Sequence, residues 1–343
     1  MTTVGFLPWW PANPYQILLK QELNKLGVRV IGNPPLSLLR ILVGRDGLDV
    51  VHVHWPHGLY TNTWQLLHVL LVLVAYRLLR NNIVWTVHEL DAYETRHPRR
   101  DAWFRSMVMR LSRRLIVHGE HTRKELLGRH AYTRPIDVVR HPAYTGWYRD
   151  DVSREQARAR LDLPNDARVY LYFGYIKPYK GVEDLIQAFD ALADDQAILV
   201  IAGKPMDETI KNEIGALATG NQRIRTHLAY IPDEAIQDFF RAADIVVFPF
   251  QHTQTSGSLM LALTYGCPVI APAIATIPEY LDENSSILFD PGIPGDLVRA
   301  LQAAADAPLD AMAQAASQRA KDYSWHAMAD VHLAGYRAIS RQS

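Results

Sequence analysis

The chain has 343 residues, 48% of them hydrophobic and 21% charged, which excludes an intrinsically disordered chain and leaves room for two domains with separate cores. The formal net charge is zero, which excludes a strongly basic nucleic-acid binder, and the one cysteine, Cys267, excludes a disulfide framework. The halves differ, however: residues 1–145 hold 19 Lys and Arg against 10 Asp and Glu, whereas the remainder holds 17 against 26. A basic first half suits an anionic surface or an anionic ligand.

The start of the chain has no basic segment followed by an apolar run, so we expect no secretory signal and a cytoplasmic protein. The segment 66–79 is strongly apolar, but His68 and Arg77 interrupt it, and it is shorter than the roughly 20 residues that span a bilayer. We expect a buried helix of an α/β layer here, with an interfacial helix as the alternative.

Short β-branched runs alternate with helical segments along the first half. The first predicted helix has clear start and stop signals. Asn13 is the expected N-cap, Pro14 is the first helical residue, and Gly27 ends the helix. Near-continuous apolar runs are typical of a parallel sheet covered on both faces. The runs that predict strands are 4–6, 28–31, 50–54, 83–88, 115–118 and 136–139.

The second half repeats this pattern, and a last helix is expected at 325–339. Two successive arrays of this kind predict two doubly wound α/β domains, 1–145 and 146–324. The linker is expected near 141–151, where Pro142 and Gly146 break the pattern. The second set of predicted strands is 169–173, 198–202, 224–228, 245–248, 269–271 and 287–289.

A glycine- and lysine-containing loop, GYIKPYKG at 174–181, follows the first predicted strand of the second half. The carboxyl ends of strands in α/β sheets bind ligands, and a lysine offsets negative charge on a diphosphate leaving group. We therefore predict that Lys180, with Lys177, binds a phosphate-bearing ligand. A loop of solvated lysines is the alternative.

A second anion-binding signal lies at 254–272, QTSGSLMLALTYGCPVIAP. A Ser/Thr/Gly turn at 255–258 opens an apolar helix, Gly266 closes it, and a strand follows at 269–271. Free backbone N–H groups at the start of a helix are ready partners for phosphate.

Together these two motifs resemble the donor-binding segments of GT-B glycosyltransferases, most strongly over residues 168–290. The resemblance implies two Rossmann-like domains that face a cleft: an acceptor-binding domain at 1–145, joined by a C-terminal helix at 325–343 that crosses back to it, and a nucleotide-sugar-binding domain at 146–324. Tyr230 is implied to contribute to the pocket for the base, and Glu279 matches a family glutamate, although it also suits a helix N-terminus. The implied donor residues are Gly174, Tyr175, Lys177, Lys180, Tyr230, Thr255, Ser256, Gly257, Ser258 and Glu279.

The chain departs from the retaining members of this fold, which carry two glutamates eight residues apart. Aligned on Gly266, these positions hold Thr253 and Leu261, and Tyr175 occupies the position of a family arginine. The two motifs are more similar to bacterial exopolysaccharide β-mannosyltransferases of the xanthan-pathway type. This resemblance implies inversion, GDP-mannose as the donor, and a glycan or polyprenyl-diphosphate-linked oligosaccharide as the acceptor. Open alternatives are a retaining hexosyltransferase that uses a UDP- or GDP-sugar, a GT-B-shaped epimerase or phosphorylase, and a non-catalytic nucleotide-sugar-binding protein.

His88 ends a predicted strand of the first half and precedes an acidic cluster. In GT-B enzymes a histidine at this place lies at the reaction centre, and inversion needs a general base for the acceptor hydroxyl. We predict Asp91 as this base, followed by Glu94 and Glu89, with His88 beside them. A solvated acidic loop is the alternative for any one of them.

The histidine-rich run at 51–57 is not expected to bind zinc, because no cysteine or well-spaced carboxylate completes a tetrahedral set. No Asp-x-Asp pair of the metal-dependent GT-A type supports a divalent ion either, so metal-independent chemistry without a cofactor is predicted. Aromatic faces pack against the C–H surfaces of sugars. The predicted acceptor-binding residues are Trp9, Trp10, Asn13, His54 and His57.

The segment 96–115 carries seven arginines, and Phe104, Val108 and Leu111 recur in it at helical spacing. A basic amphipathic helix can lie on anionic lipid, and a helix whose apolar stripe faces the core is the alternative. With the basic first half, this predicts peripheral contact with the inner face of the cell membrane.

Overall fold

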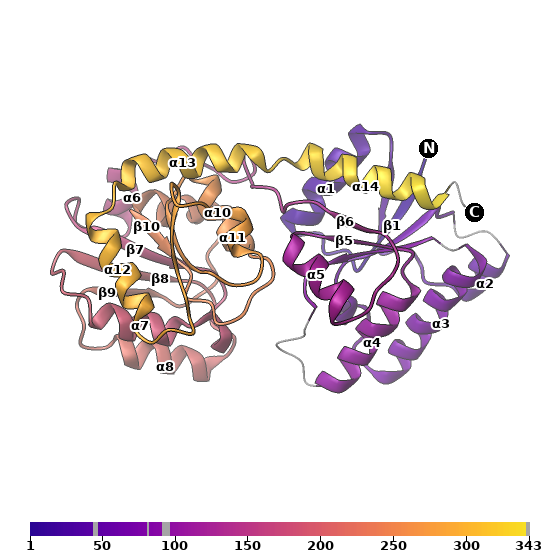
Figure 1. Cartoon of the computed structure of the whole chain (residues 1–343), viewed down its shortest axis with the longest axis horizontal. Helices are drawn as coiled ribbons and strands as arrows, with labels where there is room; N and C mark the ends of the chain where they lie inside the picture. Colours follow the sequence, from indigo (N-terminus) through magenta and orange to yellow (C-terminus); the bar gives the residue numbers. More distant parts are fainter. Residues whose placement is uncertain (44–46, 81, 91–96, 341–343) are drawn as a thin grey trace. The chain divides into compact units, whose positions relative to one another are not determined.

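The structure is a computed structural model of the chain, and it describes residues 1–43, 47–80, 82–90 and 97–340. It divides into two compact units, Met1–His141 with Ser324–Ser343, and Pro142–Tyr323 (Figure 1). Each unit has one six-stranded parallel sheet with helices around it, which confirms the predicted α/β class and the two doubly wound arrays.

The first sheet has the strand order β2-β1-β3-β4-β5-β6, so the order reverses between β1 and β3. Ligands of doubly wound sheets bind beyond the carboxyl ends of the strands at such a reversal. The strands are β1 (Thr3–Leu7), β2 (Arg29–Gly32), β3 (Val50–Val53), β4 (Ile83–Val87), β5 (Arg114–Val117) and β6 (Ile136–Val138). The helices of this unit are α1 (Pro14–Lys25), α2 (Leu38–Leu42), η1 (Pro56–Leu59), α3 (Thr63–Leu79), α4 (Pro98–Leu111), α5 (Glu120–Gly128) and α14 (Trp325–Ser340).

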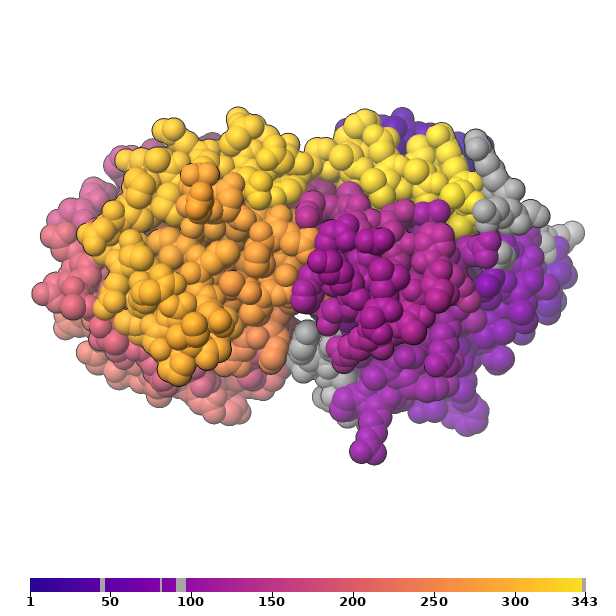
Figure 2. All heavy atoms as spheres, viewed as in Figure 1, coloured from indigo at the N-terminus to yellow at the C-terminus, as the bar shows by residue number. Residues whose placement is uncertain are grey.

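The first helix, α1, begins and ends where its sequence predicts. The Asn13 side chain accepts a hydrogen bond from the backbone N–H of Gln16, Pro14 is the first helical residue, and Gly27 adopts a left-handed φ of +79° just beyond the end. The terminal helix α14 packs against α1, as the GT-B resemblance implies. Figure 2 shows α14 in yellow on the surface of the first unit.

Helix α4 does not present its apolar stripe to solvent. Phe104 and Val108 are fully buried in the core of the first unit, and Met109 is nearly so. The alternative stated for the segment 96–115, a helix whose apolar side faces the core, is therefore the one observed for Pro98–Leu111. Among the helices that the structure describes, none is long and apolar enough to cross a membrane.

The second sheet has the order β12-β11-β10-β7-β8-β9, and it reverses between β7 and β10. Its strands are β7 (Arg168–Phe173), β8 (Ala197–Ala202), β9 (Ile224–His227), β10 (Ile245–Val247), β11 (Val269–Pro272) and β12 (Ser286–Phe289). The helices of this unit are α6 (Arg154–Arg160), η2 (Pro178–Lys180), α7 (Val182–Asp190), α8 (Glu208–Ala218), η3 (Asp233–Ala235), α9 (Ile236–Ala242), α10 (Gly257–Thr264), α11 (Ile277–Tyr280), α12 (Asp296–Asp306) and α13 (Leu309–Asp322).

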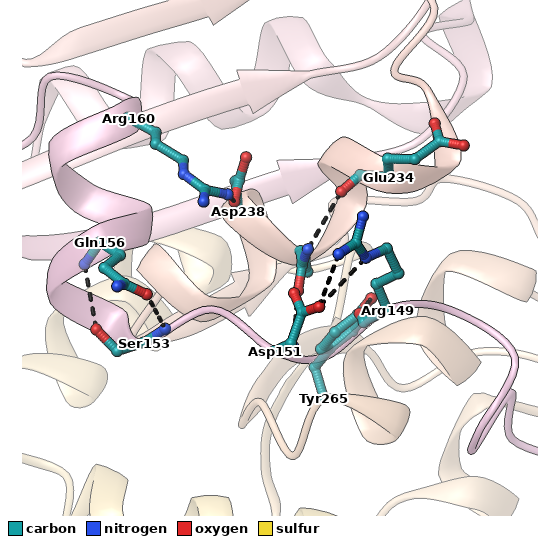
Figure 3. A network of polar contacts seen from close by, with 9 residues as sticks. Arg149, Asp151, Ser153, Gln156, Arg160, Glu234, Asp238 and Tyr265 are labelled. Carbon is teal, nitrogen blue, oxygen red and sulfur yellow. Dashed lines mark hydrogen bonds and ion pairs between the residues drawn. The ribbon is translucent and has the colours of Figure 1, made fainter.

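The segment that opens the second unit is tied to α9 and to the end of α10 by polar contacts (Figure 3). The N–H of Asp151 donates to Gln237 Oε1 at 2.9 Å, and its carboxylate pairs with Arg149 at 2.8 Å. The Tyr265 hydroxyl donates to the Arg149 carbonyl at 2.8 Å. These bonds fix the chain before α6.

The boundary between the units falls at His141 rather than at residue 145. The N–H of Ala143 donates to the carbonyl of Tyr323, and the N–H of Tyr144 donates to Thr264 Oγ1. Residues 142–145 are therefore bonded within the second unit.

Candidate active site

Two glycines allow the loop after β7 to pack closely against its neighbours in the second unit, which are the start of α10 and the loop after β8. Gly174 has a φ of +140°, and a Cβ there would lie 2.7 Å from Ser258 Oγ. Gly203 has a φ of +150°, and a Cβ there would lie 1.8 Å from the Gly174 carbonyl oxygen. A side chain at either position would push these loops apart. The two segments predicted to bind a diphosphate therefore meet at the carboxyl end of the second sheet.

Lys180 lies at the reversal point of this sheet. Its Nζ is 3.9 Å from the centre of the Phe250 ring, which follows β10 and is buried. It is also 5.1 Å from the Tyr179 ring. Cation–π contact with these rings holds the ammonium group in place. Lys177 lies 5.7 Å from the Tyr175 ring, on the same loop.

Hydrogen bonds to β7 and to the loop after β8 hold the loop that carries both lysines. The Tyr172 hydroxyl donates to the Tyr175 carbonyl at 2.8 Å, and the N–H of Ile176 donates to the Lys204 carbonyl at 3.0 Å. The backbone after β7 is thus fixed to the loop after β8, which limits the positions that the lysines reach.

Ser256 is the N-cap of α10, and its hydroxyl accepts a hydrogen bond from the N–H of Leu259 at 3.2 Å. The first turn of α10 contains no acidic residue, so no carboxylate of its own offsets the positive end of the helix dipole. Thr255, Gly257 and Ser258 flank this cap. The arrangement is suited to bind an anion beside Lys180.

The remaining predicted donor residues belong to the same unit as this site. Tyr175 and Tyr230 are both exposed and interact electrostatically, and the nearby Asp233 carboxylate is the main cause of a raised pKa at Tyr230. Glu279 is half-buried in the short helix α11. Thr253 and Leu261, which replace the glutamates of the retaining group, are both buried.

In the first unit, His54 and His88 follow β3 and β4 and contact each other. His54 Nδ1 lies 3.3 Å from His88 Nε2, and both side chains are buried. The His88 ring stacks on Trp55, with centroids 4.2 Å apart and planes 14° apart. Trp55 in turn stacks on Trp10 at 4.5 Å. Because Trp10 follows β1, this stack lies at the reversal point of the first sheet.

Four more buried histidines surround this pair. His118 Nε2 lies 3.1 Å from the Tyr15 hydroxyl, and His52 bonds to the hydroxyls of Tyr336 and Thr86 at 2.6 and 2.7 Å. The six histidine side chains are each exposed by 6% or less. They are His52, His54, His88, His118, His141 and His332.

Burial governs the ionisation of this histidine cluster. It lowers the pKa of His88 well below the usual value, and the neighbouring His118 and His54 lower it further. Burial also lowers the pKa of His118 to about 4 and that of His332 to about 3. These imidazoles are therefore neutral near pH 7, and each can accept one proton.

His118, His141 and His332 are not among the residues predicted for this site from the sequence. A signal for the first two is present, because a histidine comes one to three residues after each of four neighbouring strands, β3 to β6. Parallel strands align their carboxyl ends, so these four histidines belong to one edge of the sheet. His332 lies on α14, far away in sequence, and only the folded chain brings it to the cluster.

The predicted acceptor residues have different surroundings in the structure. Trp10 is part of the aromatic stack, and the His57 ring lies 6.2 Å from it. Trp9 instead packs on Phe6, with Lys20 over its ring. The Asn13 side chain is engaged as the α1 cap.

The predicted general bases are only partly described. Glu89 is exposed, directly after His88. Asp91 and Glu94 lie outside the residues that the structure describes.

Residues 153–323 match the model of the family "Glycosyl transferases group 1". A GDP-mannose:glycolipid 4-beta-D-mannosyltransferase of Xanthomonas campestris pv. campestris is 30% identical over 232 residues, which are 65% of this chain and 61% of that protein. A D-inositol 3-phosphate glycosyltransferase of Mycolicibacterium vanbaalenii is 32% identical over 244 residues, 66% of this chain and 53% of that protein. The chain thus spans about half to three fifths of the length of these relatives.

Solved structures resemble the whole chain. A sucrose-phosphate synthase from Thermosynechococcus elongatus gives a TM-score of 0.76 at 16% identity and is covered completely, as is this chain. WaaG, a glycosyltransferase involved in lipopolysaccharide biosynthesis, gives 0.68 at 15% identity, with 96% of this chain and 97% of that chain covered. The chain therefore has the GT-B fold, and its residues 153–323 match the group 1 glycosyltransferases.

Proposed function

We propose that this protein is an inverting, metal-independent glycosyltransferase that moves mannose from GDP-mannose to a glycan or lipid-linked oligosaccharide. The observation that carries the proposal is the close approach of Gly174, on the loop that carries Lys180, to Ser258 in the first turn of α10, at the carboxyl end of the second sheet. An ammonium group and helix N-terminal N–H groups on adjoining segments suit the diphosphate of a nucleotide sugar.

The choice of donor and acceptor draws on the Xanthomonas relative, whose name gives GDP-mannose and a glycolipid. We extend both to this chain. The exposed rings of Tyr175 and Tyr230 would stack against the base, and Thr255–Ser258 would bind the diphosphate with Lys177 and Lys180.

The residues at the positions of the two glutamates of the retaining group support an inverting reaction. Thr253 and Leu261 are buried, and neither side chain carries a carboxylate to the donor. Proton transfer then falls to the first unit. Asp91 stays our first choice for the base, followed by Glu94 and Glu89, with the neutral His88 imidazole beside them.

In this mechanism the acceptor hydroxyl oxygen attacks the anomeric carbon of mannose while the bond from that carbon to the diphosphate oxygen breaks. The base takes the hydroxyl proton. Lys180 and the N–H groups at the start of α10 stabilise the negative charge on the departing GDP. Trp10, which is 36% exposed, offers an aromatic face to the acceptor sugar near His57, and the stacked Trp55 and the buried His54 support it from behind.

We also propose that the protein works in the cytoplasm at the inner face of the membrane, where lipid-linked acceptors are available. The basic composition of residues 1–145 supports contact with anionic lipid.

A second candidate is a hexosyltransferase with another donor and acceptor, including the retaining type. The similarity to D-inositol 3-phosphate glycosyltransferases favours it. In this case a UDP-sugar could replace GDP-mannose.

A thermal-shift panel of nucleotide sugars tests the donor. A ligand at 100 times its Kd stabilises the native state by about 2.7 kcal/mol, so GDP-mannose should raise the melting temperature and UDP-sugars should not. A shift with UDP-sugars alone would reject GDP-mannose as the donor. A shift without any transfer to glycolipid acceptors would favour a binding protein.

A further inference from the structure

Helix α3 is apolar on two opposite sides, and only one of them is used by the core. Trp64, Leu67, Leu71 and Leu78 recur at intervals of three, four and seven residues, so they share one side of the helix. Trp64 is 82% exposed, Leu71 60% and Leu78 77%. The opposite side is buried and consists of Leu66, Val69, Val72, Leu73 and Tyr76.

Helix α2 packs against α3 and extends the exposed apolar surface. Leu39 and Leu42 are 69% and 61% exposed. Water-soluble monomers rarely expose neighbouring leucines in such number, and a surface of this kind marks an interaction site. We call this surface the α2–α3 face and define it by Leu38, Leu39, Leu42, Val43, Trp64, Leu67, Leu71, Leu78 and Leu79.

The two segments that carry the α2–α3 face hold positive charges and no negative ones. Residues 36–43 and 59–80 contain three arginines and no Asp or Glu. One of them, Arg77, interacts electrostatically with Arg134 and Arg113, both of which oppose its charge. Three guanidinium groups thus gather near the carboxyl ends of α3 and α4.

A polar cavity of about 490 Å³ lies beside this arginine group. Arg110, Arg129, Arg134 and His130 line it, at the end of α4 and after α5. Arg134 also donates to the Ser112 carbonyl at 2.7 Å, which fixes its guanidinium group. A pocket with this lining suits a phosphate-bearing headgroup.

We infer that the α2–α3 face docks on an anionic membrane, with its apolar side chains in the acyl boundary and the arginines of α3, α4 and 129–134 on lipid phosphates. Apolar insertion and attraction to anionic lipid reinforce each other in such surfaces, and tryptophan is enriched at membrane interfaces. This inference rests on the proposed function in one respect, namely that the acceptor is linked to a lipid.

The geometry of α3 connects docking with the candidate active site in the first unit. Helix α3 follows β3 and η1, so Trp64 lies at the edge of the sheet where His54 and the Trp10–Trp55 stack lie. A lipid-linked acceptor would enter from this edge. A second copy of the chain is the competing occupant, but the two segments that carry this face hold arginines and no Asp or Glu, so a second copy brings no opposite charge to pair with them.

Sedimentation of the full chain with vesicles tests the inference. Binding is expected to phosphatidylcholine vesicles that contain phosphatidylglycerol, to fall with added salt, and to be weak on phosphatidylcholine alone. Leu71→Glu should weaken binding by about tenfold or more, because it replaces inserted apolar area with a charge. Leu217→Glu is the matched control, since Leu217 is a 39% exposed leucine on α8 in the second unit, and it should bind as the parent protein does.

Two results would overturn the inference. One is parent-like vesicle binding by Leu71→Glu in a protein that melts at the parent temperature. The other is a dimer that Leu71→Glu converts to a monomer while vesicle binding stays unchanged, which would assign the face to a second copy. Sugar transfer to a detergent-solubilised acceptor separates the two proposals. Leu71→Glu should retain this transfer, because the acceptor is no longer in a membrane. If the parent protein transfers no sugar, the proposed function is rejected, whereas the vesicle-binding result is unaffected.

Discussion

His54 Nδ1 lies 3.3 Å from His88 Nε2, and His54 Nε2 is buried without a hydrogen-bond partner among the residues that the structure describes. An orphaned buried N–H is rarer than an orphaned buried acceptor. We therefore assign the His54 proton to Nδ1, where it donates to His88 Nε2. His54 is then a positioning residue that holds the orientation and tautomer of His88.

Replacement of His54 tests this relationship. His54→Phe keeps an aromatic ring but removes the donor, and kcat should fall by roughly 10²-fold because His88 loses its fixed orientation. His54→Asn, whose amide N–H can replace Nδ1–H, should restore much of the loss and the parent pH profile. Equal losses in both variants, with an unchanged pH profile, would indicate a packing role only.

Lys180→Ala should lower kcat by roughly 10²- to 10³-fold while the fold survives, because the charge on the departing diphosphate loses its main counterion. Steady-state kinetics and the melting temperature measure the two effects. Lys211→Ala on α8 is the control, since Lys211 pairs with Glu208 on the surface, and its activity should be close to that of the parent protein. Near-normal turnover by Lys180→Ala would remove Lys180 from the donor site.

Asp91→Asn should abolish transfer if Asp91 is the general base, because the amide cannot take the hydroxyl proton. Glu94→Gln and Glu89→Gln are the parallel variants, and each should retain measurable transfer. Donor binding by thermal shift should be unchanged in all three. Full transfer by Asp91→Asn together with loss in one of the others would move the role to that glutamate.

The histidine cluster predicts that acid destabilises the first unit. Unfolding returns the pKa of these histidines to about 6.5, whereas burial holds that of His118 near 4, so the unfolded state binds more protons below pH 6.5. The free energy of unfolding should therefore fall as the pH drops from 7 towards 4, by up to about 3 kcal/mol for His118 alone. Urea unfolding at several pH values measures this slope.

A matched pair of variants isolates the effect. His118→Gln should flatten the pH dependence, whereas His252→Gln, at an exposed position of the second unit, should leave it as in the parent protein. An acid slope that His118→Gln does not change would assign the sensitivity to other groups.

Treatment with EDTA should leave transfer unchanged, because Lys180 and the α10 N-terminus supply the charge that a divalent ion supplies in other transferases. The assay compares initial rates before and after chelation and dialysis. Lost activity that returns with Mg²⁺ or Mn²⁺ would contradict metal-independent chemistry.

Much of the fold follows from local patterns. All twelve strands occur within one residue of the apolar runs that predict them, and α1 begins at the predicted Asn13–Pro14 pair. The contact between Gly174 and Ser258 was implied by two motifs that each follow a strand of one parallel sheet. Local signals suffice here because strand, turn and cap residues act within a few positions of each other.

Other features depend on tertiary packing, and the sequence left them open. Helix α3 is apolar on two opposite sides, so its pattern does not tell which side meets the core. In α4 the arginines suggested a lipid-facing helix, but Phe104 and Val108 pack inward. Asn13 is the predicted cap of α1, and its contact with the acceptor stays a prediction. His332 joins the cluster only because α14 packs on the first unit.

The anomeric configuration of the product tests the central proposal most directly. The full chain is incubated with GDP-mannose and a glycolipid acceptor, and the one-bond C1–H1 coupling of the new mannosyl residue is measured by NMR. We expect a β-linked mannose, because the donor α-linkage is inverted in one displacement step. An α-linked product would contradict it and would assign the chain to the retaining type.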